Sequence, residues 1–305
     1  MNPFEITILG SSAAVPTKRR ALSSQIVNIN GKYLLIDCGE GTQFQLRKFG
    51  APILKIDNIL ISHLHGDHFL GLVGLLSTFD ILGRRKAVNI YCPKGVQEYV
   101  AFHTQLFGGE SFAFEINFIE HNQKSPQTII DTKSVSVQTI PLSHRVPTCG
   151  FYFKEKQILP NIRKEKIEVY NIPVKDIINI KRGADFITKE GRIIPNSVLV
   201  KDAPLPRSYA YFSDTRPNME MARVIENVKV LYHEATYGEE FYQQAVKTGH
   251  STAKEAAELA NACKTSKLLL GHFSARYDSV DSLVNEARSV FQEAYAVEDG
   301  MKIEL

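Results

Sequence analysis

Apolar and β-branched residues recur along the chain in short runs that end at polar or turn-forming residues, a pattern typical of strands. The runs cover residues 4–10, 24–29, 32–39, 58–63 and 88–93 in the first half, and 134–144, 149–154, 208–215, 228–236 and 266–274 in the second. Helical periodicity separates them over residues 39–50, 67–83, 251–263 and 279–294, with Ser251 as the expected N-cap of the third helix. Strands interleaved with helices and hairpins predict a layered α/β fold.

Residues 154–207 interrupt this alternation of strands and helices. The segment holds five prolines, and between 154 and 183 it has eight basic and four acidic residues, a local balance of +4. We interpret it as an inserted arm. The alternative is a solvated connection, because long segments without regular structure are usually either functional or disordered.

The bulk composition narrows the class of protein. The chain has 305 residues, 44% of them hydrophobic, and no apolar run approaches the roughly 18–20 residues that a membrane span needs. Residues 1–16 read as a first strand and lack the basic start of a signal peptide. The cysteines are far apart and form no CxxC pair, which predicts a reducing cytoplasm. A net charge of +3 does not demand nucleic acid, so a basic binding surface must be local.

Three imidazoles and a carboxylate crowd the end of the predicted strand 58–63. His63, His65, Asp67 and His68 lie within "HLHGDH", and burying such a group without partners would cost several kcal/mol. Imidazole nitrogens and carboxylate oxygens are the ligands that zinc takes in proteins, which favours a metal site. For a single histidine at a strand end, a satisfied structural role would be the better interpretation.

Further candidate ligands stand at later strand ends. They are His144, Asp214 and His272, and with the cluster they make five histidines and two aspartates. Two metal ions about 3.5–4 Å apart need roughly this many ligands, with one bridging carboxylate. Taken alone, each of these three residues is equally well explained as structural.

The motif "HLHGDH" resembles the HxHxDH signature of the metallo-β-lactamase superfamily, and its surroundings resemble the ribonuclease Z family more closely. The segments that carry this second resemblance are residues 9–20, 34–46, 62–72, 141–153, 212–216, 231–237, 249–260 and 271–277. It implies a four-layer αβ/βα sandwich over residues 1–305, with a tRNA-binding arm inserted at about 154–207.

The resemblance also implies two Zn²⁺ ions per subunit and assigns their ligands. One zinc would be held by His63, His65 and His144, and the other by Asp67, His68 and His272. Asp214 would bridge them. Asp37 would orient ligand histidines through their second ring nitrogen, as metal-bound histidines generally require. Its alternative is a turn cap before Gly39.

The implied reaction is hydrolysis of a phosphodiester in a tRNA precursor, which removes the 3′ trailer and leaves a tRNA 3′-hydroxyl and a 5′-phosphorylated trailer. The resemblance makes Asp67 the proton acceptor. Glu234 and His250 are candidates for protonating the leaving oxygen, with a hydrogen-bonding structural role as the alternative. His233, His103 and His121 are expected to be structural. The resemblance further implies a homodimer, and residues 69–83 contain enough apolar surface for both the core and an interface. We expect neither a membrane nor an organic cofactor.

Basic side chains are expected to contact RNA phosphates. The candidates are Lys164, Lys166, Lys181 and Arg182 in the arm, Lys18, Arg19 and Arg20 after the first strand, and Arg276 near the last candidate ligand. The alternatives are a solvated basic turn for residues 18–20 and an ion pair for Arg276. The chain departs from the family pattern twice: residues 171–183 lack the arm's glycine–proline motif, and Ala21 ends "PTKRRA" where an asparagine is usual.

Two other functions compete with this interpretation. The first is another hydrolase on the same scaffold, acting on thioesters, lactams or small phosphodiesters; such an enzyme would lack the basic arm. The second is a tRNA-binding protein with a decayed site, which the presence of all seven candidate ligands argues against.

Overall fold

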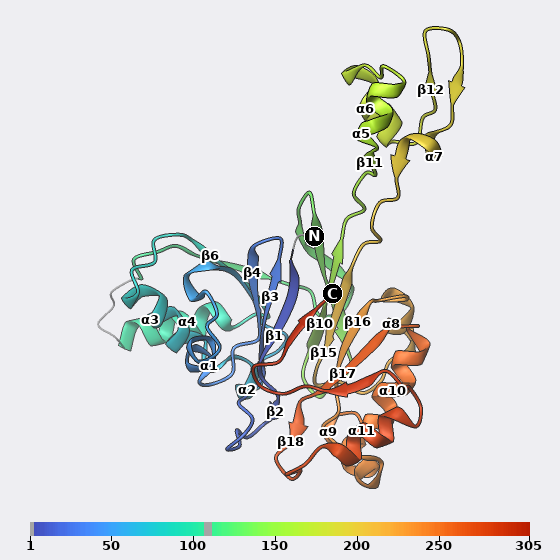
Figure 1. The fold of residues 1–305 in the computed structure, drawn as a ribbon. Coiled ribbons are helices and arrows are strands. Elements are labelled where there is room, and N and C mark those ends of the chain that lie inside the picture. The colour runs from blue at the N-terminus through green and yellow to red at the C-terminus, as the bar shows by residue number, and fades with distance from the viewer. Residues whose placement is uncertain (1–2, 107–111) are drawn as a thin grey trace. The chain divides into compact units, whose positions relative to one another are not determined.

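The N-terminal half of the chain builds one of two large sheets (Figure 1). The computed structural model describes residues 3–106 and 112–305, and within them this first sheet has seven strands in the order β20-β1-β3-β4-β5-β6-β7. The strands are β1 (Phe4–Gly10), β3 (Ser24–Ile29), β4 (Lys32–Ile36), β5 (Ile56–Leu60), β6 (Val88–Cys92), β7 (Ile116–Glu120) and β20 (Lys302–Glu304). The pairs β4–β5, β5–β6 and β6–β7 are parallel, so the ends of these strands meet at one edge.

The second sheet, again counted over the described residues, has seven strands in the order β19-β17-β16-β15-β10-β9-β8. They are β8 (Gln127–Asp131), β9 (Val135–Leu142), β10 (Thr148–Glu155), β15 (Ser208–Phe212), β16 (Val230–Glu234), β17 (Lys267–Gly271) and β19 (Ala294–Ala296). The strands β15, β16, β17 and β19 are parallel. A short parallel pair, β2 (Ser12–Ala13) with β18 (Phe273–Ser274), joins segments from both halves.

Helices pack on the outer face of each sheet. The first sheet shares a buried apolar core with α1 (Thr42–Lys48), α3 (Leu72–Ile81) and α4 (Val96–Leu106). The second shares one with α8 (Met219–Val224), α10 (Ala253–Ala262) and α11 (Asp281–Arg288). Between the sheets, the Tyr211 hydroxyl on β15 donates to Asp37, which follows β4, at 2.8 Å. The layers are helix, sheet, sheet and helix, which confirms the predicted four-layer αβ/βα sandwich.

Most predicted elements are present with slightly different ends, and two details were wrong. The helix expected over 67–83 is broken into α2 (Gly66–Phe69) and α3, because Gly71 lies against Gly39: a Cβ on Gly71 would come 2.1 Å from the Gly39 carbonyl oxygen. The N-cap of α10 is Thr252 and not Ser251, since Thr252 and Glu255 form a reciprocal capping box. The remaining elements of this part of the chain are η1 (Ile53–Lys55), η2 (Glu239–Phe241) and α9 (Tyr242–Thr248).

A second compact unit comprises Thr132–Val135 and Lys154–Pro206. It contains the short strand pairs β11 (Asn161–Ile162) with β14 (Val200–Lys201) and β12 (Phe186–Ile187) with β13 (Ile193–Ile194), and the helices α5 (Lys164–Val169), α6 (Val174–Lys181) and α7 (Asn196–Leu199). Ile180, Phe186 and Leu199 are among the side chains of its own small buried core. Across the described residues, no helix combines the length and apolarity needed to cross a bilayer.

Candidate metal centre

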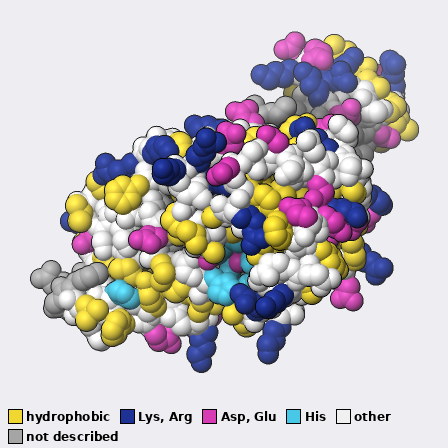
Figure 2. Space-filling view, turned by 90° about the horizontal axis from the view of Figure 1, so that it is seen from below, with side chains coloured by type: hydrophobic (Ala, Val, Ile, Leu, Met, Phe, Trp, Pro, Cys, Tyr) yellow, Lys and Arg dark blue, Asp and Glu magenta, His cyan; other side chains and the backbone are white. Residues whose placement is uncertain are grey.

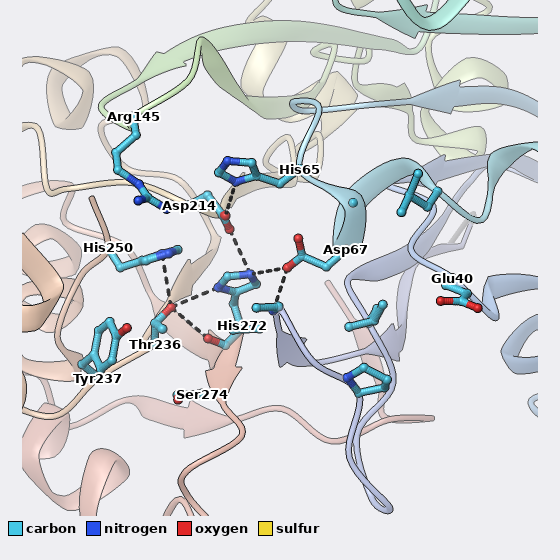
Figure 3. A pocket seen from close by; sticks show the side chains of 16 residues that line it. Glu40, His65, Asp67, Arg145, Asp214, Thr236, Tyr237, His250, His272 and Ser274 are labelled. Carbon is cyan, nitrogen blue, oxygen red and sulfur yellow. Dashed lines mark hydrogen bonds and ion pairs between the residues drawn. The ribbon is translucent and has the colours of Figure 1, made fainter. Parts of the chain in front are cut away.

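The structure brings all seven predicted ligands together beyond the ends of four strands. Figure 3 shows four of them, His65, Asp67, Asp214 and His272, around a cavity. His63, His65, Asp67 and His68 follow β5, and His144 follows β9. Asp214 follows β15 and His272 follows β17. Asp214 and His272 have backbone φ angles of 52° and 54°, as does Asp37 at 55°. Left-handed backbone at non-glycine residues costs free energy, and three of the eight such residues in the described chain are at this site.

One group of donors surrounds Asp214 Oδ2. The distances from this oxygen are 3.3 Å to His63 Nε2, 3.8 Å to His65 Nδ1 and 3.7 Å to His144 Nε2. The ring nitrogens of His65 and His144 lie 3.3 Å apart. One ligand atom from each of these four residues can be chosen so that all lie within 4.8 Å of one another.

The second group faces the other oxygen of the same carboxylate. Asp214 Oδ1 lies 3.3 Å from His68 Nε2 and 3.0 Å from His272 Nε2. Asp67 Oδ2 lies 3.6 and 3.5 Å from the same two nitrogens and accepts a hydrogen bond from the Ala14 amide at 2.8 Å. Asp214 therefore stands between two sets of donors.

Contacts on the far side of the His144, His68 and His63 rings fix which nitrogen faces the centre. His144 Nδ1 donates to the Gly249 carbonyl at 2.7 Å, and His68 Nδ1 donates to Asp37 Oδ2 at 2.7 Å. His63 Nδ1 lies 3.0 Å from the Ser62 hydroxyl, which itself donates to Asp37. Since Nδ1 of each of these three rings is engaged on the far side, Nε2 is the nitrogen that faces the centre.

Asp37 is the common anchor of this network. Its buried carboxylate accepts hydrogen bonds from the Ser62 amide at 2.7 Å and hydroxyl at 2.9 Å, from His68 and from Tyr211. It holds His68 directly and His63 through Ser62. These contacts direct the Asp37 carboxylate toward the histidines, and they favour the orienting role over the alternative role as a turn cap before Gly39.

Positive charge near the buried Asp214 carboxylate would stabilise its ionised form. Burial alone would raise the pKa of Asp214, but His272, His68 and His63 hold that pKa well below its usual range. Burial alone would lower the pKa of His68 and His272, but Asp214 outweighs it and raises the pKa of His272 to about 10. Burial lowers the pKa of His144 to about 4, which leaves it neutral.

The donor set therefore fits a divalent cation. Nε2 of His63 is fully buried and has no hydrogen-bond partner among the described residues, although a buried polar atom normally has one. Imidazole nitrogens and carboxylate oxygens converge around it, and a bound cation would satisfy this lone pair and neutralise the two aspartates.

Glu234 and His250, the two candidate proton donors, form a buried pair beside the centre. Glu234 Oε1 lies 3.0 Å from His250 Nδ1 and accepts from the Thr215 amide at 2.6 Å. The Thr236 hydroxyl donates to Glu234 Oε2 and lies 3.0 Å from His272 Nδ1. Burial alone would raise the pKa of Glu234, but His250 lowers it to about 2; burial would lower the pKa of His250, but Glu234 raises it.

Replacing Glu234 with glutamine is expected to lower the pKa of His250, because the carboxylate that raises it is gone. A proton donor is active in its protonated form, below its pKa, so the basic limb of the kcat–pH profile should move to lower pH. We expect kcat at neutral pH to fall by about 10-fold or more, within the range of general acid catalysis. The measurement is kcat against pH for wild type, Glu234→Gln and the exposed control Glu258→Gln; a limb that stays in place in Glu234→Gln contradicts the assignment.

The predicted RNA-contacting residues outside the second unit differ in whether their side chains have partners within the fold. Lys18 and Arg19 are exposed. Arg20 is engaged within the fold, since its guanidinium donates to the Tyr277 carbonyl and lies 5.7 Å from the centre of the Phe273 ring. Arg276 is not in an ion pair among the described residues. Its guanidinium lies 4.9 and 4.3 Å from the ring centres of Tyr237 and Phe241, which keeps it exposed but fixed in direction.

The three histidines expected to be structural contact backbone carbonyls. His233 Nδ1 lies 2.7 Å from the Glu234 carbonyl oxygen, His121 Nε2 lies 2.9 Å from that of Ile61, and His103 Nδ1 lies 2.8 Å from that of Tyr99. All three are separate from the groups of donors that surround Asp214.

A cavity of about 470 Å³ opens onto the centre, and it is lined by residues that sequence reasoning missed. Besides His65, Asp67, Asp214, His250 and His272, its lining includes Arg145, Glu40 and Thr236. Figure 2 shows histidine side chains reaching the surface in the middle of one face, with Lys and Arg side chains beside them. The only sequence signal for Arg145 was its position directly after His144.

The fold and this donor set define a class before any closer relative is considered. The structure is similar to that of a metallo-β-lactamase-fold protein, YhfI from Bacillus subtilis, with a TM-score of 0.69 at 18% identity over 100% of both chains. The molecule is thus a metallo-β-lactamase-fold protein whose His/Asp cluster is suited to a divalent metal.

Closer relatives narrow this class. The chain is 43% identical over 303 residues to Ribonuclease Z of Bacteroides thetaiotaomicron, covering 99% of this chain and 96% of the relative. It is 25% identical to the crystal structure of human tRNase Z, short form, with a TM-score of 0.70 over 98% of both chains. The chain belongs to the ribonuclease Z family, and over residues 4–162 it also belongs to the family whose model is described as "Anti-Pycsar protein Apyc1".

Proposed function

We propose that this chain is a zinc-dependent endoribonuclease that removes 3′ trailers from tRNA precursors and leaves a tRNA 3′-hydroxyl and a 5′-phosphorylated trailer. The observation that carries the proposal is the convergence of seven His and Asp donors on a cavity, in a chain of the ribonuclease Z family. The likeness to human tRNase Z supports tRNA as the substrate.

His63, His65 and His144 would hold one zinc ion and Asp67, His68 and His272 a second, with Asp214 shared between them. Bound zinc would supply water activation near neutral pH and would neutralise charge on phosphoryl oxygens. Asp37 orients His68 directly and His63 through Ser62, so that Nε2 of each ring faces the donor groups. Buried carboxylates such as Asp67 and Asp214 are stable only when cationic groups compensate their charge.

Asp67 accepts the proton of the attacking water in this proposal. Its carboxylate lines the cavity and is held in place by the Ala14 amide. His250, kept protonated by Glu234, gives a proton to the leaving 3′ oxygen. The ring centres of His250 and His144 are 5.0 Å apart, so the proton donor lies directly beside the metal ligands.

The second unit would bind the tRNA through its basic side chains. Of its four candidates, Lys164 and Arg182 are exposed, while Lys166 and Lys181 are half-buried. Lys166 Nζ lies 5.9 Å from the centre of the Tyr170 ring, where it remains available to phosphate.

Replacing Lys164, Lys166, Lys181 and Arg182 together with glutamine is expected to weaken precursor tRNA binding, because fewer phosphates are neutralised and fewer counterions are released. The slope of log Kobs against log salt should decrease by about one for each phosphate that is no longer neutralised. Binding is measured at several salt concentrations, alongside turnover of bis(p-nitrophenyl) phosphate as a test of the intact metal centre. An unchanged salt slope would exclude these side chains from the RNA interface.

The proposal also includes a homodimer in the cytoplasm. Leu70, Ile81 and Leu82 are exposed in the segment 67–83 and offer apolar surface to a second copy, which analytical ultracentrifugation tests. Cys38, Cys92, Cys149 and Cys263 are buried free thiols, which supports a reducing compartment and predicts normal activity in the presence of reductant.

The decisive experiment is processing of a 3′-extended tRNA in vitro, with the cut mapped to the nucleotide. We expect one cut at the start of the trailer, abolished by a chelator and restored by zinc. Cleavage of bis(p-nitrophenyl) phosphate with intact precursor tRNA would instead favour a hydrolase of small phosphodiesters. Tight tRNA binding without metal or cleavage would favour a binding protein.

A further inference from the structure

Apart from the donor groups and His250, the charged side chains that line the cavity over the metal centre are Arg145 and Glu40. Figure 3 shows Arg145 beside Asp214 and His250 with Glu40 on the opposite side. A phosphodiester carries a negative charge, so Glu40 repels it and Arg145 attracts it. The reacting phosphate therefore fits at the Arg145 side, over Asp214.

The Arg145 guanidinium is free, unlike the other arginines around the site. Arg216 is paired with Glu255, Arg20 with a backbone carbonyl and Arg276 with two aromatic rings. Arg145 is exposed and forms no hydrogen bond, ion pair or ring contact with any residue of 3–106 or 112–305. Five N–H donors thus stand unused at the edge of a cavity built for an anionic substrate.

The backbone that carries Arg145 is nevertheless firmly held. The Ser143 amide donates to Thr215 Oγ1 at 3.1 Å, and the Arg216 amide donates to the Ser143 carbonyl at 2.7 Å. The stem of the side chain lies over Gly249, where an added Cβ would come 3.3 Å from Arg145 Cγ. The backbone and Cγ of Arg145 are therefore restrained, while its guanidinium can change position to bind a ligand.

We propose that Arg145 is a catalytic residue that binds the non-bridging oxygens of the scissile phosphate, an inference that rests on the proposed function. The planar guanidinium can donate two parallel hydrogen bonds to phosphate oxygens. Negative charge on these oxygens increases as the water attacks, so the interaction is stronger in the transition state than in the ground state. Such an interaction raises kcat more than it lowers KM.

The test compares Arg145→Gln and Arg145→Lys with wild type on precursor tRNA and on bis(p-nitrophenyl) phosphate. We expect kcat of Arg145→Gln to fall by about 10- to 100-fold on both substrates, the range of one charge-assisted hydrogen bond, with Arg145→Lys in between. The Kd for uncleaved precursor tRNA, measured with a chelator present, should remain close to wild type because many other phosphates remain bound. Zinc content and thermal stability are measured on each variant.

The matched control is Arg223→Gln, an exposed arginine on α8, which should behave as wild type on the small substrate. Two results would overturn the inference: wild-type kcat on both substrates in Arg145→Gln, or a weaker Kd with unchanged kcat, which indicates ground-state tRNA binding only. If wild type hydrolyses only the small phosphodiester, the proposed function fails, and the Arg145 comparison on that substrate still decides the inference.

Discussion

Cleavage of precursor tRNA is expected to fall by at least about 10³-fold when Asp67 is replaced by alanine, since proton acceptors alone contribute about 10²–10⁴-fold. In the proposed centre Asp67 is both a metal ligand and the proton acceptor. Its Oδ2 lies 3.6 and 3.5 Å from the inward nitrogens of His68 and His272, and its side chain faces the cavity. Burial would raise its pKa, but His68 and His272 hold the pKa below its usual range, so the side chain is ionised at neutral pH.

The Asp67→Asn variant distinguishes a loss of charge at position 67 from a loss of packing. Asp67→Asn keeps the size of the side chain and an oxygen for the Ala14 amide, yet it lacks the negative charge, so we expect the same loss of turnover. Single-turnover cleavage and zinc content are measured for both variants, with the exposed Asp202→Asn as control. Wild-type turnover in a variant that retains its zinc would reject Asp67 as the proton acceptor.

The sequence located the metal centre because its chemistry is concentrated at strand ends. His63, His65, Asp67 and His68 fall within six residues just after β5, and packing alone does not account for so many polar groups there. Taken alone, the distant partners His144, Asp214 and His272 could not be distinguished from structural residues. Their strand-end positions and the cluster's need for further ligands made them candidates, and the family resemblance assigned their roles. The fold explains why they meet, since each lies just beyond a strand that ends at the same edge of its sheet.

The strands that escaped prediction include β7 and β8, and for these two the reason is physical. β7 and β8 are the outermost strands of their sheets, and their side chains are half-buried or exposed along their whole length. An edge strand of this kind lacks the strict alternation of apolar and polar residues that marks a strand with one buried face. The break at Gly71 was equally invisible, because it depends on close packing against Gly39, a distant part of the chain.

The interactions of the arginine side chains were the feature that the sequence predicted least well. In the sequence, Arg145 and Arg276 each follow a candidate ligand, whereas Arg20 belongs to a basic turn after the first strand. In the structure Arg20 is bonded to a backbone carbonyl, Arg276 lies against two rings and Arg145 is free among the described residues. These differences depend on tertiary structure, so only the fold separates a structural arginine from one available to substrate.

Asp214 is expected to be the most sensitive position, because one carboxylate serves both groups of donors. Its Oδ2 faces His63, His65 and His144, and its Oδ1 faces His68 and His272. Asp214→Ala should therefore lose both of the proposed zinc ions and all detectable cleavage, measured by elemental analysis and by processing of precursor tRNA. Removing one partner from a buried charge pair typically costs about 3–5 kcal/mol, so chemical denaturation with chelator should also show a less stable fold.

The matched comparison is His65→Ala, which removes a half-exposed donor from the first group only. If Asp214 is shared, His65→Ala should lose about one zinc ion of the two that this centre is proposed to bind, while Asp214→Ala loses both. Asp214→Asn, which keeps the size of the side chain but not its charge, should resemble Asp214→Ala in zinc content and retain more of the stability. Equal zinc loss in His65→Ala and Asp214→Ala would mean that the two groups fill together, and one zinc retained in Asp214→Ala would show that the carboxylate belongs to a single group.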